Sequence, residues 1–247
     1  MQKYLLWITV CLMSIITGCD EDYDHLVHSY SDAPWSVITK QAAYQNGIED
    51  MASYHLLSEM MSGIGNVDQL IQLTIDSRES RNTPHNIYLP GSTLYEELCK
   101  KHGDRVNPPV DFYQAHQLVP KTPYSVIDFQ SLEVFCSEDF DAEHPAGCSL
   151  LDILHFATMT PNRVLRNNYQ VYFDTDVLCN KDGVQWFNVY KRATDVKQDD
   201  LSIINFLYLS FDKLPEPVGP RNIKVRLTAD DGKVYDFETV LTFQKIE

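Results

Sequence analysis

Residues 222–243 read NIKVRLTADDGKVYDFETVLTF. Apolar and polar side chains alternate from Ile223 to Leu227, which is the two-residue period of a half-buried β-strand. Asp231 and Gly232 then tolerate the positive φ angles of a tight turn, and a second alternating run follows them. This stretch therefore predicts a β-hairpin at the end of the chain.

Upstream segments rich in aromatic and β-branched residues predict further short strands. They are expected at 68–76, 126–135, 169–174, 186–190 and 202–211, with a turn at 180–183. The alternation breaks inside the second of these segments, which indicates a bulge. Short strands, turn residues and little helix predict a mainly β fold, an Ig-like β-sandwich, with a closed barrel as the alternative.

A few short helices are expected, chiefly in the N-terminal half. Residues 41–61 have a loose apolar face. Thr93 and Glu96 have the spacing of a capping box, and Gly103 is a natural stop, which together predict a helix over 94–102. A further helix is expected at 149–158, where apolar residues precede a proline.

The N-terminal segment has the pattern of a lipoprotein signal. Lys3 precedes an apolar run from Tyr4 to Ile16, which is shorter than the roughly 20 residues needed to span a bilayer. Two small residues then precede Cys19, as in the bacterial lipobox, where the cysteine thiol receives a diacylglyceryl group. We predict a signal peptide over 1–18 and lipidation of Cys19. The alternative is an ordinary signal peptide that happens to contain a cysteine.

Acidic residues follow the proposed lipid site directly. Residues 20–24 read DEDYD, which resembles the surface-export signal of Bacteroidota lipoproteins. In other bacteria such a sequence would favour retention at the inner membrane, and a solvated acidic tether is the simplest alternative. The expectation is an outward-facing protein lipid-anchored to the outer membrane. An acidic tether is expected over 19–40 and a single mostly-β domain over 41–247, with 124–247 its clearest sandwich part.

The charge balance restricts the possible partners. The chain has 35 acidic and 20 basic residues, a formal net charge of −15. Nucleic-acid binding depends on neutralising phosphates with cations, so this balance argues against it. It also argues against an electrostatic membrane patch, which leaves the lipid as the predicted membrane contact.

Four of the six cysteines lie outside the predicted signal and lipid site. An exported protein leaves the reducing cytoplasm, so two disulfides are plausible, with three possible pairings. Cys136 and Cys148 flank one loop, which favours that bridge and leaves Cys99 with Cys179. A zinc site is the weaker alternative, because no CxxC pair occurs; Cys99 and His102 form a Cys–His pair at short ligand spacing.

Two blocks resemble a family of uncharacterised Bacteroidota surface lipoproteins. The first is 127–152, whose more specific part is the DFD…HPAG run from Asp139 to Gly147; the second is the hairpin 223–242. Together with the residues between them, the two blocks cover about half of the chain. Ser or Thr is more usual in the family at the positions of Cys136 and Cys148, which leaves a disulfide there open. The resemblance implies a fold and a location and carries over no catalytic residue.

The acidic loop of the first block is a candidate cation site. Its carboxylates, Glu138, Asp139, Asp141 and Glu143, offer the oxygen ligands that Ca²⁺ prefers. The spacing matches no calcium-binding loop with its turn glycine, so a solvated acidic loop is the favoured interpretation. No other cofactor is indicated.

The sequence favours a non-enzymatic binding or structural role, because no HExxH, GxSxG, Walker A or complete GxGxxG pattern occurs. Glycan is the leading ligand class, with a surface protein as another possible partner. Trp35, Tyr88, Tyr113 and Tyr124 lie near prolines and are candidates for a sugar-stacking platform. The alternative is a surface hydrolase acting on glycans, whose paired carboxylates would be distant in sequence.

Overall fold

The computed structural model describes residues 27, 29–39, 70–75, 86–105, 123–166, 168, 179–180, 183–184 and 188–244. Within these residues the chain is mainly β, as predicted, and forms several sheets. All described strand pairs are antiparallel except one. Helices are few and short, and none of those described is long and apolar enough to cross a membrane.

The larger sheet has five strands in the order β10-β7-β11-β3-β2. Their bounds are Trp35–Thr39 (β2), Leu70–Ile75 (β3), Leu154–Met159 (β7), Asn188–Arg192 (β10) and Phe206–Phe211 (β11). Alternate residues of each strand face opposite sides of the sheet. In β11, Leu207 and Leu209 face the main core, whereas Tyr208 belongs to a separate apolar cluster on the outer face.

The second sheet has three strands in the order β13-β12-β6. It comprises Phe129–Cys136 (β6), Pro220–Ala229 (β12) and Val234–Thr242 (β13). The predicted closing hairpin is confirmed, and its turn has Gly232 at φ 84°. The expected bulge is also present, because Thr228 pairs with Ser131 while Ala229 pairs with Phe129, which leaves Gln130 as the extra residue.

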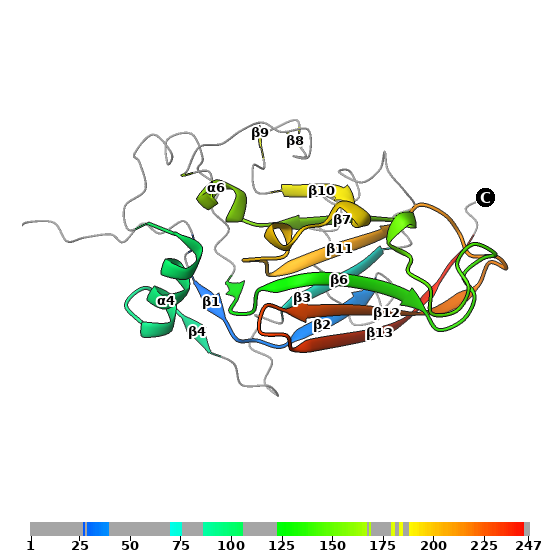
Figure 1. Cartoon of the computed structure of the whole chain (residues 1–247), viewed down its shortest axis with the longest axis horizontal. Helices are drawn as coiled ribbons and strands as arrows, with labels where there is room; N and C mark the ends of the chain where they lie inside the picture. The colour runs from blue at the N-terminus through cyan, green and yellow to red at the C-terminus, as the bar shows by residue number, and fades with distance from the viewer. Residues whose placement is uncertain are drawn as a thin grey trace, which may run out of the picture.

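The two sheets share one hydrophobic core (Figure 1). Phe156 from β7 and Leu209 from β11 are fully buried in the same cluster as Val134 from β6 and Val225 from β12. Burying one such side chain contributes roughly 1.5–3 kcal/mol, so this shared interior is the main source of stability. At one end of the core Phe140 stacks on Phe211 at 5.5 Å.

A smaller unit lies beside the sheets (Figure 1). Its strands, in the order β4-β1-β5, are Ile87–Tyr88, Tyr30–Ser31 and Tyr124–Ser125, and β1 and β5 form the parallel pair. Helix α4 (Thr93–His102) confirms the prediction and ends at Gly103, with φ 72°. Its N-cap is Ser92, one residue before the expected Thr93, and no capping-box bond forms.

The remaining described elements are short. They are the helix α6 (Asn162–Arg166), the 3₁₀ turns η2 (Leu151–Ile153), η3 (Ala193–Asp195) and η4 (Gln198–Asp200), and the strands β8 (Cys179–Asn180) and β9 (Gly183–Val184). The pairing of β8 with β9 confirms the turn expected at 180–183.

Two expectations are corrected. The helix predicted over 149–158 is wrong, because only η2 is helical and the chain then enters β7 between β10 and β11. The tether expected over 19–40 is too long, because β1 and β2 belong to the sheets and Tyr30 is fully buried. The signal peptide with Cys19, the helix expected at 41–61 and the strand at 169–174 lie outside the described residues.

Candidate functional site

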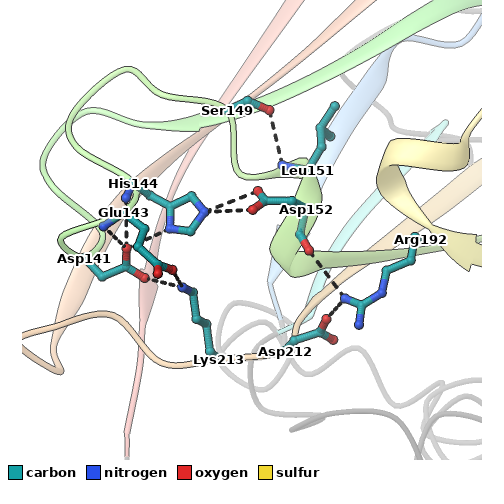
Figure 2. A network of polar contacts seen from close by, with 9 residues as sticks. All are labelled: Asp141, Glu143, His144, Ser149, Leu151, Asp152, Arg192, Asp212 and Lys213. Carbon is teal, nitrogen blue, oxygen red and sulfur yellow. Dashed lines mark hydrogen bonds and ion pairs between the residues drawn. The ribbon is translucent and has the colours of Figure 1, made fainter.

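The loop 137–149, between β6 and η2, carries a network of ion pairs (Figure 2). Phe140 anchors this loop in the core, and its backbone N–H and C=O bond to His144 and Glu216 at 2.9 and 2.8 Å. Gly147, at φ 77°, supplies the positive φ of the turn that closes the loop, and its N–H donates to the carbonyl of Cys136. The buried ring of Phe140 and these backbone hydrogen bonds fix the position of the loop.

The side chain of His144 lies between two carboxylates. Its Nδ1 is 2.7 Å from Asp141 Oδ1, and its Nε2 is 3.1 Å from Asp152 Oδ2. A neutral imidazole has one N–H, so only the imidazolium can donate to both acids. Burial opposes the charged form, but the hydrogen bonds to Asp141 and Asp152 outweigh it and raise the pKa of His144. We infer that His144 is an internal counter-ion of the loop.

Lys213 completes this part of the network from the segment after β11. Its Nζ lies 2.8 Å from Asp141 Oδ2 and 3.1 Å from Glu143 Oε2. Burial alone would raise the pKa of the Asp141 carboxyl, but the bonds from Lys213 and His144 hold it well below its usual range. The Asp141 carboxylate is therefore ionised at neutral pH, and the ammonium of Lys213 and the protonated form of His144 compensate its charge.

The four calcium candidates do not converge on one centre. Glu138 Oε1 accepts the N–H of Asn222 at 3.0 Å, and Asp139 Oδ1 accepts the N–H of Ala146 at 2.8 Å. Asp141 and Glu143 do approach each other, and with His144 they form a group whose ligand atoms lie within 4.8 Å of one another. The ammonium of Lys213, bonded to both carboxylates, already supplies the positive charge there.

A second histidine–aspartate pair, His155 with Asp212, is connected to the first through Arg192; Figure 2 shows Arg192 and Asp212 beside the network. His155 Nδ1 is 2.6 Å from Asp212 Oδ1, and Arg192 donates to the other oxygen of the same carboxylate. Arg192 also reaches the backbone carbonyl of Asp152 at 3.5 Å, which connects the two pairs. Burial, reinforced by the charge of Arg192, lowers the pKa of His155. The two histidines therefore have opposite charge preferences.

Hydroxyl groups flank His155 on the outer face of the five-stranded sheet. Ser210 pairs with His155 across β11 and β7, and the ring of Tyr190 stacks on the imidazole at 5.2 Å. Nucleophilic catalysis by a serine needs a hydrogen bond to its base. Ser210 Oγ makes no hydrogen bond to His155 or to any other described residue, so the arrangement is not that of an activated nucleophile.

The described cysteines Cys99, Cys136 and Cys148 are free. The bridge expected between Cys136 and Cys148 is absent because the first side chain is buried in the core and the second is exposed. Burial raises the pKa of Cys99 to about 12, and His102 bonds Asp128, at 3.3 Å, instead of joining the thiol in a metal site. The side chain of Cys179 lies outside the described residues.

The predicted sugar-stacking platform is wrong for two of its members. Trp35 and Tyr124 are buried, the first bonding Ser125 Oγ through its indole N–H at 3.1 Å. Tyr88 is half-buried and donates to Asp32 at 2.9 Å, while Tyr113 lies outside the described residues. Pro34 and Pro123 therefore border core positions, not an open aromatic surface.

Sequence reasoning identified Asp141 and Glu143 but missed the partners that complete the network. Lys213, Asp152 and Arg192 come from other elements, and only the short DAEH spacing from Asp141 signalled a local contact.

Comparisons of the chain with protein-family models, with curated proteins and with solved structures find no match. The functional argument therefore rests on the chain's own sequence and geometry.

Proposed function

We propose that the chain is an exported lipoprotein, anchored through Cys19 to the outer membrane and facing outward, with an Ig-like β-sandwich that has a non-enzymatic binding role. The lipobox pattern before Cys19 and the acidic residues after it support the anchor and the location. The resemblance of 127–152 and 223–242 to Bacteroidota surface lipoproteins supports the same assignment.

The order of the strands is the observation that carries the Ig-like assignment. In constant-type Ig domains, strands A, B, E and D form one sheet and strands G, F and C the other. Here β2-β3-β11-β7 takes the first order and β13-β12-β6 the second, with every pair antiparallel. β10 is an additional strand at the edge of the first sheet. Along the chain it comes between β7 and β11, which correspond to strands D and E. Such sandwiches frequently serve as rigid scaffolds for binding surfaces.

The bonding of the polar network argues against hydrolytic chemistry at the 137–149 loop. His144 and Lys213 are each held by two carboxylates, as expected of groups that fix a loop. A glycan hydrolase needs one carboxyl group kept protonated as a general acid, whereas Asp141 is held ionised by its cationic neighbours. A surface hydrolase remains the second candidate and has weaker geometric support.

Fatty-acid labelling tests the anchor. Cells producing the chain with its own leader are grown with an alkyne-tagged palmitate, and the purified protein is examined for the tag. Wild type and Cys148→Ser, an exposed control thiol, are expected to carry the label, whereas Cys19→Ser is expected to lose it. Labelling that persists in Cys19→Ser would refute the proposed anchor.

A further inference from the structure

The last strand of the second sheet, β13, has a neighbour on one side only among the described strands. It pairs with β12 over its full length, and Figure 1 shows it in red at the border of the sandwich. An open edge of this kind presents a row of backbone N–H and C=O groups that can pair with another strand. Proteins commonly interrupt such an edge with a bulge or a proline, and β13 has neither.

The hydrogen bonds of the hairpin show which backbone groups of β13 face the open edge. Next to the turn, Ala229 N–H donates to the carbonyl of Lys233 at 2.8 Å. Just after the strand, Phe243 N–H donates to the carbonyl of Gly219 at 3.3 Å. Such bonds recur at every second residue of an antiparallel ladder, so the odd-numbered residues of β13 bond β12. The N–H and C=O groups of the even-numbered residues in 234–242 therefore point to the open edge.

Apolar side chains lie on both faces of this edge. On the outer face Val234 and Val240 are 50% and 60% exposed. On the inner face Tyr235 and Phe237 pack against the core but are only half-buried. Single exposed apolar residues are common on protein surfaces, whereas four of them along one open strand form a continuous apolar border of the kind found at interfaces.

The two exposed valines are placed symmetrically about Phe237, three residues before it and three residues after it. When two copies of β13 pair antiparallel about a two-fold axis at Phe237, Val234 of each copy lies opposite Val240 of the other. This register also joins even-numbered residues, whose backbone groups point to the open edge. An axis one residue away, at Asp236 or Glu238, would instead place a valine opposite a carboxylate. Backbone direction and side-chain pattern thus select the same register.

The acidic side chains of the edge are compensated within each copy. In this register Asp236 faces Glu238 of the second copy, and like charges opposite each other destabilise a sheet. Lys224 Nζ, however, lies 2.9 Å from Asp236 and 3.4 Å from Glu238. Arg226 Nε adds a further contact to Asp236 at 2.7 Å. Each copy therefore brings the cations that neutralise its own carboxylates, and the charge of the edge does not prevent pairing.

We propose that two copies of this chain pair through β13 as a two-fold dimer, which joins their three-stranded sheets into one continuous sheet. A two-fold contact is isologous, so the same residues serve both copies. Backbone hydrogen bonds between the two strands supply affinity, and the contacts of Val234 with Val240 and of the two Phe237 rings fix the register. This inference goes beyond the proposed function and does not depend on the lipid anchor.

Engineered cysteines test the register. All variants carry Cys148→Ser, which removes an exposed native thiol, and the full chain is purified in a non-ionic detergent with its own leader processed. Val234→Cys and Val240→Cys are oxidised with copper phenanthroline, separately and as a mixture, and cross-linked dimers are resolved on a non-reducing gel. Directly opposite residues have Cα atoms about 5.5 Å apart, within reach of a disulfide. Two copies of position 234 would lie roughly 20 Å apart in this register.

The mixture is expected to give at least tenfold more cross-linked dimer than either variant alone. The Cys148→Ser parent should give none, and neither should Val240→Cys mixed with Val218→Cys, because Val218 is an exposed valine outside β13. Equal cross-linking by the separate variants and the mixture, or no cross-linking in the mixture, would overturn the proposed pairing.

Light scattering after size-exclusion chromatography, with the mass of the detergent subtracted, measures the assembly without engineered cysteines. The wild type is expected at twice the mass of one chain. Val240→Lys should weaken the dimer roughly tenfold, because each dimer loses two valine contacts and an edge lysine opposes pairing. Val218→Lys is the matched control and should leave the dimer unchanged. A wild type with the mass of one chain, or a dimer insensitive to Val240→Lys, would overturn the proposal and leave the edge to a different partner.

Discussion

Nε2 of His144 lies 3.1 Å from Oδ2 of Asp152, which joins the 137–149 loop to the turn that leads into β7. The opposite ring nitrogen is bonded to Asp141, so both contacts persist as hydrogen bonds only while the imidazole is protonated. This relationship makes the stability of the loop depend on pH in a direction that can be tested.

His144→Gln should destabilise the protein more at pH 5.5 than at pH 8.5. The pKa of His144 is raised in the folded state, so its stabilisation is complete below the unfolded value of about 6.5 and is lost as pH rises through the folded pKa. We expect a difference of the order of 1 kcal/mol between the two pH values, measured as the free energy of unfolding in urea.

His155→Gln is the matched control for that pH dependence. The pKa of His155 is lowered in the folded state, so its neutral form is favoured and the protein gains stability as pH rises through the unfolded value. Replacement should therefore remove a pH dependence of the opposite sign. Equal pH responses in the two variants would contradict the assigned roles.

Phe140→Ala should destabilise the protein by about 3–5 kcal/mol, as expected for a large side chain removed from a core. The ring is fully buried and contacts Phe211 and Phe243, both at 5.5 Å between centroids. Urea unfolding monitored by circular dichroism measures the loss. Phe135→Ala, on the half-buried outer side of β6, should have a clearly smaller effect; the reverse order would show that the loop is not anchored by Phe140.

Gly232→Ala should destabilise the closing hairpin by about 1–2 kcal/mol through backbone strain alone. A side chain at this position would meet no atom within 4 Å, but the residue adopts φ 84°. The thermal midpoint of unfolding would report the change. The neighbouring substitution Asp231→Ala, which removes one exposed bond to the N–H of Lys233, should alter the midpoint less.

Cys148 should react quickly with iodoacetamide in the native protein, whereas Cys136 and Cys99 should react only after unfolding. Cys148 is exposed, while burial raises the pKa of both other thiols and lowers their thiolate content. Mass spectrometry of the labelled peptides distinguishes the three sites. Protection of Cys148 that is relieved by a reducing agent would reveal the disulfide that the structure lacks.

The hairpin of β12 and β13 could be predicted because its alternation and its Asp-Gly turn are local features of the sequence. The sequence of β7 does not distinguish strand from helix, because a short apolar run has no decisive period and the two neighbours of β7 in the sheet are distant in sequence. The candidate site likewise combines residues that are close in sequence with residues that are distant. Asp141 and Glu143 were visible in one loop, but Lys213 meets them only through the packing of the fold.

Protease treatment of intact cells tests the central claim most directly. Proteinase K is added to cells producing the chain with its own leader, and the chain is then detected by immunoblotting alongside a periplasmic reference protein. An outward-facing lipoprotein should be digested while the reference survives. Protection of the chain until the outer membrane is permeabilised would contradict the surface location and the binding role built on it.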